Sequence, residues 1–143
     1  MTSLSLEIPC QPQALADVME RLDIFARENA LSSTTHHHVQ LIVEELVLNA
    51  IRYGGLPETA HIDLAIRTES NDLLIDIRDR GRPFDPTQHK TPDVTLSIED
   101  RPIGGLGVYL SQVLADEIHY CHENGENRIS LRKRIHHDSP CVD

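Results

Sequence analysis

The sequence predicts an α+β fold, a two-layer α/β sandwich in which a mixed, mostly antiparallel sheet carries its helices on one face. Three observations lead to this prediction. Strand patterns come in pairs joined by turn residues, helical patterns lie between the pairs, and the regular strand–helix–strand rhythm of a parallel sheet is absent. With 143 residues, the chain has the length of one domain. We expect that domain to cover residues 1–135, followed by a flexible tail at residues 136–143.

The first two predicted elements are a short strand and an amphipathic helix. Leu4, Leu6 and Ile8 alternate with polar residues, which is typical of a strand, and two prolines follow. Within residues 13–29, apolar residues recur every three or four positions, as they do on one face of a helix.

A second helix is expected from Thr35 to Tyr53. Hydroxyl side chains at residues 32–35 offer N-caps, and Gly54 follows the helix, where glycine commonly ends the helical backbone. The middle of this segment, LIVEELVLNAI, is apolar almost all round and should be deeply buried. Two acids and an asparagine in such a setting require an explanation, because burying polar groups is costly.

Two hairpins and a third helix complete the expected fold. Alternating apolar residues at 62–66 and 73–77 flank a polar turn, and a second pair at 118–120 and 129–133 flanks Asn124-Gly125, a frequent hairpin turn. Between the hairpins, the polar and proline-containing residues 86–103 have the length of a functional lid. A glycine cluster then opens the third helix.

Composition and charge exclude several classes of protein. Lys plus Arg total 13 and Asp plus Glu total 23, which gives a formal net charge of −10. That balance argues against a nucleic-acid binder and against docking to an anionic membrane. The chain has no apolar run of membrane-spanning length, no signal-peptide pattern at its start, and three cysteines without metal-site spacing. We therefore expect a cytoplasmic protein with no direct nucleic-acid partner and no membrane partner.

Glu45 and Asn49 form the first candidate site. Four residues apart on a helix, they lie on one face, about 6 Å apart along the axis. An asparagine carbonyl is a suitable oxygen ligand for Mg²⁺, and a carboxylate one turn away can accept a proton from an attacking hydroxyl. The alternative is that both side chains only satisfy neighbouring backbone groups. Glu44 points elsewhere on the helix and should be the more exposed acid.

Two further candidates follow along the chain. Asp79 at a strand end can accept a hydrogen bond from an amino group such as that of adenine, and Gly81 leaves room for a flat ligand. The alternative is a simple turn, which favours the same residues. The glycine cluster of residues 104–107 at a helix start can hold phosphates with its free N–H groups. The alternative there is a flexible joint, since the cluster lacks the Lys-Ser/Thr ending of a P-loop.

Adjacent histidines at residues 36–38, with two more at 136–137, raise a third possibility, a histidine-rich metal carrier. Consecutive helical residues point in different directions, so adjacent histidines do not converge on one ion. A solvated helix start is the simpler interpretation.

In their order along the chain, these motifs resemble those of the Bergerat-fold (GHKL) ATP-binding superfamily, over about residues 38–134. The asparagine box corresponds to ELVLNAI at Glu45, the first glycine box to DRGRPFDP at Asp79, and the second to GGLGVYL at Gly104. Within this superfamily, DRGRPFDP and GGLGVYLSQVLADEIHY look most similar to the anti-sigma-factor serine/threonine kinases.

The resemblance implies a Bergerat ATP-binding fold and a role for each matching position. Asn49 would ligate Mg²⁺, and Glu45 would be the general base of phosphoryl transfer. Asp79 would bind adenine, with Gly81 giving room. The remaining nucleotide-binding positions would be Arg101, Gly104, Gly105, Leu106 and Gly107, and the last three would offer backbone amides to the phosphates.

The sequence departs from the family pattern at two places. Tyr53 stands where members often carry histidine, and the second glycine box contains no basic residue. Phosphoryl transfer requires positive charge on the γ-phosphate beyond Mg²⁺. The cations that can supply it are Arg52, Arg80, Arg82 and Arg101.

The resemblance thus predicts a bacterial regulator that binds ATP and Mg²⁺ and phosphorylates a serine or threonine of an anti-anti-sigma antagonist. A sigma factor would be the other partner, and the family tends to form homodimers. The alternative is a non-catalytic ATP-binding module that sequesters its partner.

Overall fold

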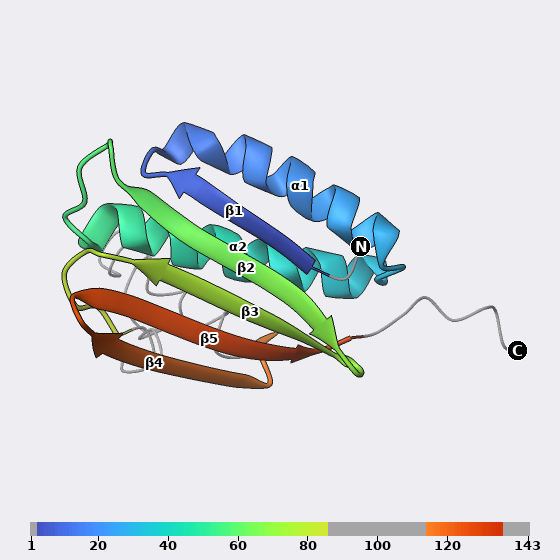
Figure 1. Cartoon of the computed structure of the whole chain (residues 1–143). Coiled ribbons are helices and arrows are strands. Elements are labelled where there is room, and N and C mark those ends of the chain that lie inside the picture. Colours follow the sequence, from blue (N-terminus) through green and yellow to red (C-terminus); the bar gives the residue numbers. More distant parts are fainter. Residues whose placement is uncertain (1–2, 86–113, 136–143) are drawn as a thin grey trace, which may run out of the picture.

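The computed structural model describes residues 3–85 and 114–135, which form a five-stranded sheet with two helices on one face (Figure 1). The strands are β1 (Ser3–Pro9), β2 (His61–Glu69), β3 (Asp72–Asp79), β4 (Glu117–Glu123) and β5 (Glu126–Arg134). The helices are α1 (Leu15–Glu28) and α2 (Ser33–Tyr53), and a 3₁₀ turn, η1 (Pro12–Ala14), precedes α1.

The strand order in the sheet is β1-β2-β3-β5-β4, and all four pairings are antiparallel. The chain passes from β3 to β4 at the sheet edge, and the β4–β5 hairpin then returns β5 to the position beside β3. The expected two-layer α+β fold is therefore confirmed. Among the described strands the sheet is antiparallel throughout, because each strand is laid down by a hairpin or an antiparallel return rather than by a parallel crossover.

The core lies between the sheet and the two helices, and among the described residues it is aliphatic apart from Phe25 and Cys10. Alternate residues of each strand point to the helices, as the period of two in a strand requires. The apolar side chains with 0–1% exposure are Ile8, Ile42, Val43, Leu46, Val47, Ile62, Leu64, Ile66, Leu73, Ile75 and Ile77.

Helix α2 begins two residues before the predicted start at Thr35 and ends, as predicted, at Tyr53. Its start is explained by Ser32, whose Oγ accepts a hydrogen bond from the Thr35 N–H at 3.1 Å and so caps the first turn. The first predicted helix, residues 13–29, becomes the η1 turn followed by α1, because Pro12 opens a 3₁₀ turn there.

Part of the predicted fold lies outside the described residues. This holds for the lid, the glycine cluster, the tail at 136–143 and the third helix, of which only Leu114 is described, as helical. Within residues 3–85 and 114–135, no helix is long and apolar enough to cross a membrane.

Candidate functional site

Two polar side chains continue the core-facing rows of neighbouring strands. In β3, the buried row of Leu73, Ile75 and Ile77 ends in Asp79, which is 7% exposed. In β5, the corresponding row begins with Asn127, which is 3% exposed. These two residues are directly opposite each other in the pairing of β3 with β5. The sheet therefore presents a carboxylate and an amide to the layer of helices.

Helix α2 brings Asn49 to the same place. Ile42, Leu46 and Asn49 follow one another at helical spacing and are all buried. A cavity of about 10 Å³ lies between this part of α2 and the ends of β3 and β5. Its lining residues are Leu46, Asn49, Ala50, Gly54, Asp79, Arg82, Phe84, Asn127 and Ile129. The cavity has room for about one water molecule. It shows that Asn49 and Asp79 line the same space, but it is too small to enclose a whole ligand.

Asn49 is a buried amide with an unmet need for hydrogen bonds. It is 2% exposed, and neither Oδ1 nor Nδ2 has a partner among the described residues. An unsatisfied buried polar group costs about 1–3 kcal/mol, so native proteins rarely keep one without a reason. Within the described residues, this side chain therefore has no backbone partner of the kind that the alternative interpretation requires. Its oxygen fits a hard cation such as Mg²⁺.

Glu45 lies one turn before Asn49 and is half-buried, with Oε2 inaccessible and without a partner among the described residues. Burial raises the pKa of Glu45, the positive charge of Arg52 lowers it, and the charge of Glu44 raises it. The net direction is upward. Glu44 itself is exposed, as the sequence predicted. A carboxylate with a raised pKa is a better proton acceptor than an ordinary one.

The turn after β3 is attached to the end of α2 through backbone contacts. The Arg82 N–H donates to the Gly54 carbonyl at 2.8 Å. A Cβ at Gly81 would lie 2.6 Å from the Gly54 oxygen and 3.0 Å from Asp79 Oδ1. Glycine is therefore required at position 81 by packing against Gly54, whatever room it also leaves for a ligand. This close contact fixes the end of β3 relative to the helix that carries Asn49.

The four arginines that the sequence suggested as sources of positive charge for the γ-phosphate lie in different places. Arg52 is exposed at the end of α2, and its charge acts on Glu45. Arg82 lines the cavity and its guanidinium lies against Gly55. Arg80 lines a different surface hollow, next to the β4–β5 turn. Arg101 lies outside the described residues, as do Gly104, Gly105, Leu106 and Gly107.

The sequence reasoning missed Asn127. Its amide Nδ2 donates to Asp79 Oδ1 at 3.1 Å, and the Gly81 N–H donates to the same oxygen at 2.8 Å. A signal was present in the sequence, because Asn127 lies two residues before Ile129 and four before Leu131, in the inward-facing row of the same strand. Lys133, at the other end of this row, is also buried, and its Nζ donates to the Leu114 carbonyl at 2.7 Å.

The histidines do not assemble a metal site in the described part of the chain. No group of three or more metal-ligating side chains occurs within residues 3–85 and 114–135. His36 Nε2 instead lies 4.0 Å from Asp23 Oδ1 of α1.

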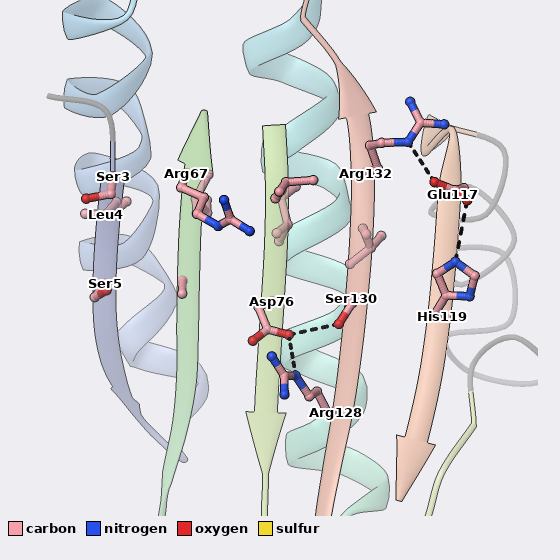
Figure 2. Close-up of a pocket in the computed structure, with 15 residues that line it drawn as sticks. Ser3, Leu4, Ser5, Arg67, Asp76, Glu117, His119, Arg128, Ser130 and Arg132 are labelled. Atoms are coloured by element: carbon pink, nitrogen blue, oxygen red, sulfur yellow. Dashed lines mark hydrogen bonds and ion pairs between the residues drawn. The ribbon is translucent and has the colours of Figure 1, made fainter. Parts of the chain in front are cut away.

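A second hollow, of about 390 Å³, lies on the other face of the sheet, away from the helices (Figure 2). Its arginines are matched by acids. Arg128 contacts Asp76 at 3.1 Å, and Arg132 contacts Glu117 at 2.7 Å. These cations are therefore already neutralised by neighbours, and this face is separate from Asn49 and Asp79.

A comparison with protein families identifies the family of the chain. A family model described as the histidine kinase-like ATPase domain matches residues 8–133. The chain belongs to this family. The match confirms the superfamily that the motifs predicted, and it includes both the helix of Asn49 and the strand of Asp79.

Its relatives among known proteins are named as kinases. The serine/threonine-protein kinase BtrW of Bordetella bronchiseptica is 25% identical over 128 residues, which cover 89% of this chain and 90% of the relative. The serine-protein kinase RsbW of Bacillus thuringiensis is 22% identical over 126 residues, which cover 85% and 79%. These are kinases of the kind that the resemblance predicted.

Solved structures share the fold. The RsbU and RsbW domains of Rv1364c from Mycobacterium tuberculosis match with a TM-score of 0.73 and 16% identity, over all of this chain and 35% of that one. This chain thus spans about a third of that protein chain. A chain of the SiaB–SiaC complex from Pseudomonas aeruginosa matches with a TM-score of 0.60 and 13% identity, covering 92% and 89%.

Proposed function

We propose that this domain binds ATP with Mg²⁺ beside α2 and the end of β3, and transfers the γ-phosphate to a serine or threonine of a small antagonist protein. By its similarity to serine kinases, the antagonist would be an anti-anti-sigma factor, and the chain itself an anti-sigma factor of bacteria. The relatives named as serine or serine/threonine kinases support this class of reaction.

The observation that carries the proposal is the amide of Asn49, which has no hydrogen-bond partner within residues 3–85 and 114–135. A ligand explains why this 2% exposed amide, one turn after an acid, has both polar atoms without partners in that part of the chain. Asn49 Oδ1 would coordinate Mg²⁺. When bound, Mg²⁺ neutralises phosphate charge and holds the phosphate oxygens in place.

Glu45 would accept the proton of the attacking hydroxyl. Burial raises its pKa, which makes it a stronger base, while Arg52 keeps an ionised form accessible. Arg52, whose charge lowers the pKa of this carboxylate, is one candidate for the cation near the γ-phosphate. The remaining candidates for that charge are Arg82 and Arg101.

Asp79 would accept a hydrogen bond from the adenine amino group, and Gly81 would let the base approach. Backbone amides of Gly105, Leu106 and Gly107, following Gly104, would hold the phosphates at the start of a helix. These roles come from the family motifs.

Transfer of labelled phosphate tests the proposal. The protein is incubated with γ-labelled ATP, Mg²⁺ and each anti-anti-sigma-type protein of the same organism, and label is sought on serine or threonine. Glu45→Ala should abolish transfer while ATP still binds. Glu44→Ala is the matched control, because it removes the neighbouring exposed acid, and it should leave transfer intact. Normal transfer by Glu45→Ala would refute the role of this residue.

Absence of label on any antagonist, with ATP still bound, would instead support the alternative of a non-catalytic module that sequesters its partner. A sigma factor as second partner, a homodimer and a cytoplasmic location complete the proposal. Co-purification with sigma factors and light scattering of the purified chain test the first two.

A further inference from the structure

Asn127 holds the end of β3 and the turn that follows it. Its two Nδ2–H groups are shared among three oxygens, namely Asp79 Oδ1 at 3.1 Å, the Gly81 carbonyl at 3.2 Å and the Arg82 carbonyl at 2.7 Å. Since Asn127 is on β5 and its acceptors follow one another at the end of β3, one side chain joins two strands and a turn.

The other end of the same amide meets only donors. Oδ1 of Asn127 accepts hydrogen bonds from the Tyr120 hydroxyl of β4 and from the Phe84 N–H at 3.4 Å. The oxygen therefore faces donors and the nitrogen faces acceptors, which determines the orientation of the amide. A carboxylate of the same shape would face the carboxylate of Asp79.

Both hydrogen bonds that Asp79 accepts within the described residues end on its Oδ1, one from the Gly81 N–H and one from Asn127. The carboxylate is held by that oxygen, and Oδ2 accepts no hydrogen bond from the described residues. An acceptor held in this way favours a ligand that presents a donor and disfavours one that presents an oxygen.

We infer that Asn127 is a positioning residue that orients Asp79 toward the amino group of adenine, and so sets the preference for adenine over guanine nucleotides. The inference rests on the proposed ATP site. Adenine carries an amino group where guanine carries a carbonyl oxygen, so only adenine can donate to Asp79 from that position. If the amide is replaced, the carboxylate loses its orientation and the discrimination falls.

Calorimetric titration with Mg·ATP and Mg·GTP at pH 7.5 and pH 5.5 tests this role in Asn127→Asp. At pH 7.5 the second carboxylate repels Asp79, and ATP affinity should fall by roughly ten-fold to a hundred-fold, as expected for loss of a hydrogen bond to a charged group. GTP affinity should change less, so the ATP-to-GTP ratio falls. At pH 5.5 the pair can share a proton, which restores a donor and should recover ATP affinity.

The matched control is Asn124→Asp, the same chemical change at an exposed position of the same hairpin. It should match the unsubstituted chain at both pH values. A merely structural role for Asn127 predicts equal losses for ATP and GTP without recovery at low pH, and that result would overturn the inference. So would an unchanged ATP affinity in Asn127→Asp.

Should Asn127→Asp fail to fold by circular dichroism, Asn127→Ser takes its place. It removes the long amide without adding charge, and it should lower the ATP-to-GTP ratio without any recovery at pH 5.5. An unchanged ratio would overturn the inference. If the unsubstituted chain binds no ATP, the proposed function is wrong. Titration of the unsubstituted chain with Mg·ATP therefore distinguishes an error in the proposed function from an error in the role given to Asn127.

Discussion

Replacing Asn49 with leucine should make the protein more stable and abolish its binding of Mg·ATP. Leucine has the same branched shape as asparagine but no polar atoms, so the change removes two buried groups that lack partners among the described residues. Each such group costs about 1–3 kcal/mol, and crowding by the larger methyl groups offsets part of the gain. We expect a net gain of about 1–2 kcal/mol in the free energy of unfolding.

That gain converts to a shift in melting temperature. A chain of 143 residues has an unfolding entropy of about 0.3 kcal/mol per kelvin, so the melting temperature should rise by about 3–7 °C. Thermal unfolding by circular dichroism without nucleotide measures this rise. The same scan with ATP and Mg²⁺ should then raise the melting temperature of the unsubstituted chain and leave that of Asn49→Leu unchanged.

Asn29→Leu is the matched control, because the Nδ2 of Asn29 donates to the Phe25 carbonyl at 2.8 Å. Loss of that satisfied bond should lower the free energy of unfolding by about 0.5–1.5 kcal/mol. If Asn49→Leu is destabilised as much as Asn29→Leu, or if it still responds to ATP, Asn49 is an ordinary structural residue and the reasoning fails.

Three further substitutions or reactions test other parts of the structure. Gly81→Ala should lower the free energy of unfolding by about 1–3 kcal/mol in urea denaturation, because the new Cβ would meet the Gly54 oxygen at 2.6 Å; a neutral effect would contradict the close contact. Burial raises the pKa of Glu45 in the folded protein above its value in the unfolded chain. As the pH rises from the unfolded-state pKa through the folded-state pKa, ionisation of Glu45 therefore lowers the free energy of unfolding. Glu45→Gln should therefore have a higher melting temperature than the unsubstituted chain at pH 7, and the two melting temperatures should approach each other at pH 4. A difference in melting temperature that is larger at pH 4 than at pH 7 would contradict the raised pKa. Burial also raises the pKa of the Cys10 thiol, so iodoacetamide should alkylate the exposed Cys121 faster than Cys10, as peptide mass spectrometry would detect; equal rates would contradict the burial of Cys10.

Much of the fold was readable from local patterns. Alternating apolar residues predicted the hairpins, and the run LIVEELVLNAI predicted a deeply buried helix. The end of α2 at Tyr53 was also predicted, because Gly54 follows it. These features depend on sequence neighbours, which is why the sequence alone reveals them.

The features that depend on distant pairing were not readable. The position of β5 beside β3 sets Asp79 opposite Asn127, and no local pattern fixes that strand order. The reason for glycine at position 81 likewise comes from Gly54, which lies far away in the sequence and in a different element. Sequence reasoning therefore found Asp79 and Asn49 as candidates but missed the amide that holds Asp79.

Direct titration of Mg·ATP into the unsubstituted chain and into Asp79→Asn measures whether α2 and β3 together form an adenine nucleotide site. We expect the unsubstituted chain to bind, and Asp79→Asn to bind at least about ten-fold more weakly, since a hydrogen bond to a charged group contributes about 1.5–3 kcal/mol. Absence of binding to the unsubstituted chain, or equal binding by the two proteins, would contradict it.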